Sequence, residues 1–252
     1  MLHNTQIIIL AGGKGKRMGG EIPKALIPLN NRPIISYLLD SVKNCDFEIK
    51  PLVVIGFRDD LVQAELGDIV NYALQEKQLG TGHAVLRAKQ MVDAATENII
   101  VLYGDMPNTK TETIKKLLEI HNNESPAITM MTTKVPDFEN EHSGFLGFGR
   151  VVRDEFGNIK KIVEIRDASM EEKNITELNP SLFCFNANWL WENLPKINNN
   201  NAQGEFYLPD MVGLAIEQGQ KISSLQINPM ECIGINTVEE LRRAEGVVQI
   251  SN

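Results

Sequence analysis

Short apolar runs alternate with helix-patterned segments through the first half of the chain. Five apolar runs are predicted strands, at residues 7–10, 52–56, 69–74, 99–103 and 127–133. Apolar residues recur at helical spacing in the segments between them, at residues 34–44, 59–66, 83–92 and 111–121. None of these five strands carries a charged residue, as expected for strands that are buried on both faces. The alternation predicts a Rossmann-like α/β fold, with a mostly parallel mixed sheet and helices on both faces.

The pattern changes in the second half of the chain. Residues 148–153 and 159–164 flank the turn-forming residues 154–158, which predicts an antiparallel hairpin. Further strands are expected at 182–185 and 222–227, and further helices at 189–194, 208–217 and 238–248. We therefore expect one domain over residues 1–252, with a smaller antiparallel lobe. Its expected parts are about 1–135, about 136–235 and a C-terminal helix at about 237–249.

Composition narrows the class of protein. Of 252 residues, 42% are hydrophobic and 23% are charged, which is typical of a soluble globular protein. The formal net charge of -8 argues against a nucleic-acid partner, and the sequence shows neither a membrane-spanning run nor a secretory leader. Three widely spaced cysteines, with no CxxC motif, are expected to be reduced thiols. These features predict a cytoplasmic protein with no membrane partner, and they leave protein partners unknown.

A loop rich in glycine and cations follows the first predicted strand. It contains Gly12, Gly13 and Gly15, and the nearby cations are Lys14, Lys16, Arg17 and Lys24. Glycines let backbone N–H groups approach a ligand, and the excess of positive charge in an acidic chain indicates an anion such as phosphate. The loop matches neither a Walker A motif nor a dinucleotide-binding fingerprint. A surface loop with solvated cations remains the alternative.

Two further polar clusters follow predicted strands. Asp105 comes directly after residues 99–103, where a carboxylate is suited to a divalent cation beside phosphates, although it could simply cap a turn. Gln75 and residues 78–82 offer amide and backbone groups that could bind a base edge, or they could form a polar turn before a helix. Because ligands bind at the carboxyl ends of strands in open α/β sheets, we expect these clusters to meet there.

These motifs together resemble a known family. Residues 10–18 with Pro23 and Lys24 resemble the signature of sugar-1-phosphate nucleotidyltransferases. Residues 78–84 and 103–105 narrow the resemblance to the uridylyltransferase domains of the bifunctional bacterial enzymes that make UDP-N-acetylglucosamine. Further matching segments follow in order, at residues 147–150, 162–164, 179, 201–207 and 234–236.

The resemblance implies transfer of UMP from UTP to N-acetylglucosamine-1-phosphate, with Mg²⁺ as cofactor. It implies a nucleotide-binding first half, in which the uridine is held by Ala11, Gly12, Gly13, Gln75, Gly80 and Thr81. The phosphates would be clamped by the catalytic residues Arg17 and Lys24, and the metal would be held by Asp105 and Asn236. The sugar pocket, mostly in the second half, would be lined by Tyr103, Gly147, Glu164 and Asn179. Glu164 could instead face solvent, and Asn236 could cap the following helix.

Three departures from the family pattern stand out. Phe148 occupies a position where the family usually has Tyr, and Pro180 and Ser181 replace a Thr-Gly pair. Both lie on the sugar side, so the sugar is less firmly indicated than the nucleotide. The bifunctional enzymes also continue into an acetyltransferase domain of hexapeptide repeats, and this sequence shows no such repeat. We therefore expect neither acetyl transfer nor the trimer that this region builds.

Other functions remain open. The same chemistry could act on another sugar, such as glucose-1-phosphate, or on another nucleotide, such as CTP, although the loop at residues 78–82 favours uridine. A catalytically silent nucleotide-sugar sensor is a different class, and the presence of Arg17, Lys24, Asp105 and Asn236 together argues against it. A glycosyltransferase is disfavoured because Arg58-Asp59-Asp60 does not supply an Asp-x-Asp metal motif.

Overall fold

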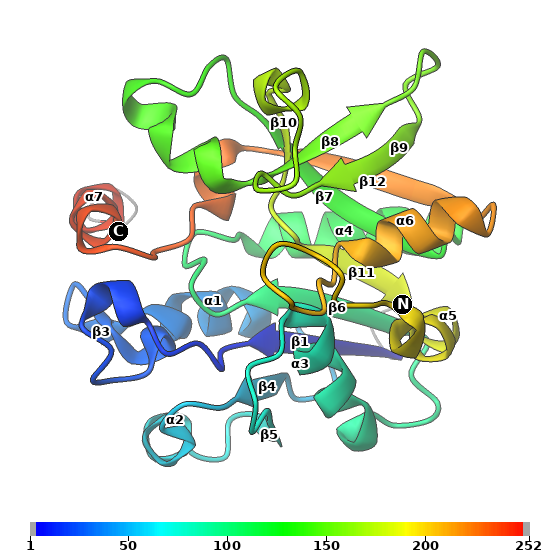
Figure 1. Ribbon diagram of the computed structural model, residues 1–252. Helices are drawn as coiled ribbons and strands as arrows, with labels where there is room; N and C mark the ends of the chain where they lie inside the picture. The colour runs from blue at the N-terminus through cyan, green and yellow to red at the C-terminus, as the bar shows by residue number, and fades with distance from the viewer. Residues whose placement is uncertain (1–3, 249–252) are drawn as a thin grey trace.

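A ten-stranded sheet forms the centre of the computed structural model, which describes residues 4–248 (Figure 1). The order is β5-β4-β1-β6-β11-β7-β10-β8-β9, and β12 pairs with β7. The strands are β1 Thr5–Leu10, β4 Leu52–Ile55, β5 Asn71–Leu74, β6 Asn98–Tyr103, β7 Ile128–Lys134, β8 Gly149–Arg153, β9 Ile159–Val163, β10 Glu177–Asn179, β11 Phe183–Asn186 and β12 Ile222–Ile227. A separate two-stranded sheet joins β2 (Pro28–Leu29) and β3 (Arg32–Pro33).

The first half of the chain forms the parallel part of the sheet. β5, β4, β1 and β6 are paired in parallel, with Ile8 opposite both Leu52 and Val101. The strand β11 then lies antiparallel between β6 and β7, and its core residues Phe183 and Phe185 are fully buried. β7 consequently runs in the same direction as β6, and β12 extends the sheet in parallel. The predicted mostly parallel mixed sheet is confirmed.

The predicted antiparallel lobe is a continuation of the same sheet. β8 and β9 form the expected hairpin, and β10 joins β8 to the end of β7. Sequence patterning did not predict β10, because a strand of three residues is too short to show periodicity. The lobe lies above the parallel part of the sheet in Figure 1.

Helices cover both faces of the sheet, as predicted. They are α1 Ile34–Lys43, α2 Asp59–Leu66, α3 Thr81–Ala88, α4 Thr111–Glu124, α5 Ala187–Asn193, α6 Asp210–Glu217 and α7 Val238–Val248. Short 3-10 helices are η1 Lys16–Met18, η2 Lys24–Leu26, η3 Lys89–Met91, η4 Asn140–Gly147, η5 Glu172–Asn174, η6 Leu194–Lys196 and η7 Pro229–Cys232. Ile7 and Ile9 of β1 pack in one core with α1, α2 and α4, whereas Ile8 packs with α3, α5 and α6. Successive strand residues point to opposite faces, so the uncharged strand supplies both cores.

The C-terminal helix returns to the start of the chain. Ile235 and Ala244 pack with Ile27, Leu29 and Ile34, so α7 lies beside β2 and β3 (Figure 1). The expected domain limits at 1–3 and 249–252, and the last residue of the helix predicted at 237–249, lie outside the described residues. All three cysteines are free and buried, as expected for reduced thiols. Between residues 4 and 248, no helix is long and apolar enough to cross a membrane.

Candidate active site

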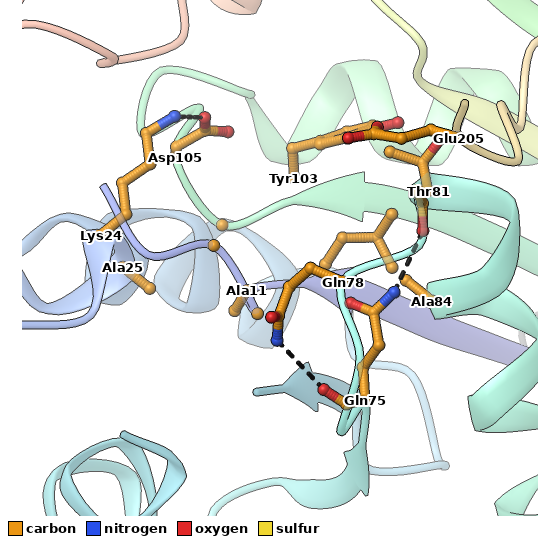
Figure 2. Close-up of a pocket in the computed structure, with 15 residues that line it drawn as sticks. Ala11, Lys24, Ala25, Gln75, Gln78, Thr81, Ala84, Tyr103, Asp105 and Glu205 are labelled. Carbon is orange, nitrogen blue, oxygen red and sulfur yellow. Dashed lines mark hydrogen bonds and ion pairs between the residues drawn. The ribbon is translucent and has the colours of Figure 1, made fainter. Parts of the chain in front are cut away.

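Most of the predicted site residues converge at the carboxyl ends of the parallel strands. A cavity of about 260 Å³ opens where β1 and β6 end, beside the loop after β5 (Figure 2). Its lining includes the predicted residues Ala11, Gly12, Gly13, Lys24, Gln75, Gly80, Thr81, Tyr103 and Asp105. The parallel pairing of β5, β4, β1 and β6 brings these separate segments to one edge of the sheet.

Lys24 forms the centre of a charged cluster at one end of the cavity. Its Nζ donates to Asp105 Oδ2 (Figure 2) and, at 2.6 Å, to Asn236 Oδ1. Arg17 Nη2 also donates to Asn236 Oδ1, at 3.3 Å. The cluster therefore unites the 3-10 turns after the glycine-rich loop, the end of β6 and the segment before α7. Because the cations lie beside a cavity, they are available to a polyanionic ligand.

The oxygens of this cluster fit a magnesium ion. Asp105 Oδ1 is buried and has no hydrogen-bond partner among residues 4–248. Together with Asn236 Oδ1 it offers the hard oxygen ligands that Mg²⁺ prefers. In the described part of the chain no cluster of three or more His, Cys, Asp or Glu residues could hold a metal. Proteins usually bind Mg²⁺ through one or two carboxylates together with substrate phosphates, so Asp105 and Asn236 would be the residues that hold it here.

A capping box fixes the backbone at Asn236. Glu240 Oε2 accepts hydrogen bonds from the N–H groups of Asn236 and Thr237, at 2.5 and 3.0 Å. The Thr237 Oγ1 in turn accepts from Glu240 N at 3.2 Å. Reciprocal bonds of this kind satisfy the free N–H groups at a helix start. Thr237 is therefore the residue that caps the helix, and the Asn236 side-chain oxygen instead accepts hydrogen bonds from Lys24 and Arg17.

The loop between β5 and α3 is held against the chain segment at residues 206–208. Gly80 has φ +109°, and an added Cβ there would lie 2.5 Å from Phe206 O. Gly82 N donates to Phe206 O at 2.8 Å, and Thr81 Oγ1 accepts from Leu208 N at 2.9 Å. Only glycine combines this backbone conformation with this close approach. The contacts fix the wall of the cavity that carries Gln75 and Thr81.

The acidities of Tyr103, which lines the cavity, and of Glu164 are both perturbed. Burial raises the pKa of the Tyr103 phenol, and the charges of Glu164 and Asp105 raise it further. Burial raises the pKa of Glu164 to about 7, with smaller contributions from Asp210 and Asp167. Glu164 is half-buried, so the alternative hypothesis that it faces solvent is wrong. Buried carboxyls with raised pKa values are frequent in binding sites for polar ligands.

Asn179 is buried, and its side chain forms hydrogen bonds within a local turn. Its Oδ1 accepts from Ser181 N at 2.9 Å, and its Nδ2 donates to Ser181 Oγ at 3.2 Å. Ser181 has φ +62°, the left-handed conformation that glycine adopts with least strain. The glycine of the usual family pattern fits this position, and here the Asn179 side chain supports a serine instead.

Gly147 is not brought together with the other predicted residues. It is exposed, and apart from its chain neighbours no heavy atom of residues 4–248 lies within 4 Å of the position of an added Cβ. Gly149 is buried instead, and an added Cβ there would lie 3.1 Å from Glu164 Oε1. Phe148, between them, is half-buried with its ring centroid 5.3 Å from that of Phe145. The backbone that faces Glu164 is therefore that of Gly149.

Comparison with known proteins assigns the family. The model of the MobA-like NTP transferase domain matches residues 7–205. The chain belongs to this nucleotidyltransferase family. It is 36% identical over 243 residues to the bifunctional protein GlmU of Clostridium novyi, covering 96% of this chain and 52% of that protein. It is also 36% identical over 241 residues to the bifunctional protein GlmU of Desulfotalea psychrophila, covering 95% and 69%.

The nucleotidyltransferase spans about half the length of the Clostridium novyi relative. A solved structure from Bacillus anthracis, a putative glucose-1-phosphate thymidylyltransferase, has the same fold. The TM-score is 0.76 at 20% identity, and the match covers 98% of this chain and 96% of that one.

Sequence reasoning missed two residues that bear on the site of this nucleotidyltransferase. Glu205 lines the cavity, and its backbone is held by Asn201, whose Nδ2 donates to Glu205 O at 2.6 Å. Gly149 faces Glu164. Only the family resemblance points to the segment at 201–207, because a polar loop carries no periodic signal. Gly149 could not be told apart from Gly147 by the sequence, because both glycines lie in the same short segment.

Proposed function

We propose that this nucleotidyltransferase transfers UMP from UTP to N-acetylglucosamine-1-phosphate, giving UDP-N-acetylglucosamine and pyrophosphate. One observation carries the proposal. The loop with Gln75, Gly80 and Thr81 forms one wall of the cavity that ends at Lys24 and Asp105. A base on that wall would direct its phosphates toward the charged cluster. The motifs that resemble uridylyltransferase domains, and the 36% identity to proteins named GlmU, support this choice of substrates.

The reaction needs positioning and charge neutralisation more than proton transfer. A phosphate oxygen of the sugar-1-phosphate attacks the α-phosphorus of UTP, and pyrophosphate leaves. Because the attacking oxygen is already anionic at neutral pH, no general base is required. Lys24 and Arg17 would neutralise phosphate charge as the two anions meet, which is the main source of catalysis in phosphoryl transfer. Asp105 and Asn236 would hold Mg²⁺, which supplies further positive charge to phosphate oxygens.

The remaining predicted residues would bind the nucleotide and the sugar. Backbone N–H groups of the loop at Ala11, Gly12 and Gly13 can approach the nucleotide closely because the glycines lack side chains. Tyr103, Glu164 and the backbone of Gly149 would face the sugar, and the buried phenol and carboxyl can each hydrogen-bond hydroxyl groups. The roles of Gly147 and Asn179 in lining the sugar pocket stay predictions.

Pyrophosphate release tests this proposal. UTP and Mg²⁺ are incubated with N-acetylglucosamine-1-phosphate or with glucose-1-phosphate, and initial rates are compared. We expect a strong preference for the acetylated sugar. Preference for glucose-1-phosphate would keep the reaction and correct the sugar. Absence of release with either, from a folded protein that binds UTP, would contradict the enzyme and favour a nucleotide-sugar sensor.

A further inference from the structure

Gln75 is 5% exposed, and its side-chain amide has a defined orientation. Its Nε2 donates to Gly80 O at 3.1 Å and lies 3.0 Å from His83 Nδ1. A carbonyl oxygen can only accept, so the NH₂ end of the amide must face Gly80. Oε1 consequently points toward Gly12, at 3.2 Å from the position of an added Cβ, and accepts no hydrogen bond from the described residues. Gln75 therefore presents an unpartnered acceptor at the wall of the cavity.

This orientation fixes the tautomer of His83. The second hydrogen of Gln75 Nε2 needs an acceptor, so His83 Nδ1 must carry a lone pair and the ring proton must lie on Nε2. His83 is the third residue of α3, where the positive end of the helix dipole disfavours an imidazolium. Burial and the charge of Arg87 lower the pKa of His83 in the same direction. The neutral ring is the form that accepts from Gln75.

We propose that His83 is a specificity-determining residue, which together with the Gly80 carbonyl holds Gln75 with its Oε1 toward the base and so selects uracil over cytosine. The inference rests on the proposed uridine site. Uracil carries an N–H at ring position 3, which Gln75 Oε1 can accept. Cytosine has a lone pair at the same position, so two acceptors would face each other, and an unpaired polar contact of this kind strongly disfavours a ligand. An amide free to flip would bind either base.

Two substitutions separate this role from simple packing. His83→Leu removes the acceptor, whereas His83→Gln keeps an acceptor oxygen on a side chain of similar reach. Affinities for UTP and CTP are measured calorimetrically with Mg²⁺ and without sugar phosphate, so that no turnover occurs. We expect H83L to reduce the UTP-to-CTP affinity ratio about tenfold, as for the loss of one buried hydrogen bond, and H83Q to retain most of the ratio. His142→Leu, which changes a histidine paired with Asp137 outside the cavity, should leave the ratio unchanged.

The outcomes distinguish the inference from the function on which it rests. Wild-type protein that binds UTP no better than CTP would contradict the proposed uridine site. Wild-type preference for UTP that persists in folded H83L would overturn the role of His83 alone. A second measurement needs no variant: the ¹⁵N NMR spectrum of histidine-labelled wild-type protein should show His83 Nδ1 without a proton. A protonated Nδ1 would overturn the inference.

Discussion

Lys24 Nζ donates to Asn236 Oδ1 at 2.6 Å, across 212 positions of sequence. The same ammonium group bonds Asp105, so a single cation joins the two residues whose oxygens fit Mg²⁺. These three residues come from η2, from the loop after β6 and from the segment before α7. The end of the cavity that we propose to be catalytic is therefore assembled by packing of distant segments.

Removal of the Lys24 ammonium should lower turnover without unfolding the protein. Lys24→Ala and Arg17→Ala are each expected to lower kcat at least about a hundredfold, by analogy with loss of one preorganised donor in a transition state. Initial rates of pyrophosphate release measure the effect, with thermal unfolding as the control for folding. Near-normal turnover in both folded variants would contradict the assigned roles.

Asp105→Asn should weaken metal binding. The substitution removes the negative charge of the carboxylate and replaces one of its two oxygens, so fewer oxygens remain as possible metal ligands. One of the two oxygens of Asp105 is the buried, unpartnered Oδ1. Because loss of residues that merely support ligands costs 10–100-fold in metal affinity, we expect a loss of at least about tenfold. Electron paramagnetic resonance of Mn²⁺, with UTP present, measures the affinity independently of turnover. Unchanged Mn²⁺ affinity would place the metal elsewhere.

Glu240 should affect both helix stability and the metal site. Glu240→Ala removes the acceptor for two N–H groups, one of them that of Asn236, and should lower the free energy of unfolding by about 1 kcal/mol. Because the backbone of Asn236 loses a partner, Mn²⁺ affinity should also fall, by about tenfold. Glu239→Ala is the matched control, since Glu239 is exposed on the same helix and forms no such bonds. Equal behaviour of the two variants would disprove the positioning role.

Gly80→Ala should destabilise the wall of the cavity. The left-handed φ of +109° costs about 1–3 kcal/mol for other residues, and the new Cβ would approach Phe206 O to 2.5 Å. Chemical denaturation measures the loss of unfolding free energy, and calorimetry should show weaker UTP binding. Gly213→Ala, at a helix position with open space, should instead be neutral or slightly stabilising. A fully stable G80A variant would contradict the described packing.

Glu164 should make stability decrease with rising pH. Its pKa is about 7 in the folded protein and 4.5 ordinarily, so the folded state binds more protons between these values. The free energy of unfolding should therefore fall as pH rises from about 4.5 to 7. Glu164→Gln should flatten this dependence, although Asp210, with a pKa raised to about 6 by burial, should leave part of it. The exposed Glu171→Gln is the control, and identical pH profiles for the E164Q and E171Q variants would contradict the raised pKa.

Features set by local sequence were predictable. The uncharged run that forms β1, the glycine-rich loop after it and Asp105 after β6 all follow from residue patterns a few positions long. The positions of parallel strand ends then placed these features at one edge of the sheet, and the cavity lies there.

Features that depend on pairing between distant segments were not predictable from the sequence pattern. The pattern of β11 indicated a strand, yet only packing against β6 and β7 determines that it lies antiparallel between them. Likewise the approach of Phe206 to Gly80 and the bond from Lys24 to Asn236 depend on segments more than 100 residues away. Periodicity describes one element at a time, so it cannot supply such partners.

The fate of the UTP α-phosphate tests the central claim most directly. UTP labelled at the α-phosphorus is incubated with N-acetylglucosamine-1-phosphate, Mg²⁺ and the protein, and the products are separated by chromatography. Transfer of UMP predicts that the label appears in UDP-N-acetylglucosamine, in amounts equal to the pyrophosphate released, and that Lys24→Ala abolishes most of it. Label that stays in UTP, or appears in free UMP, would contradict the account.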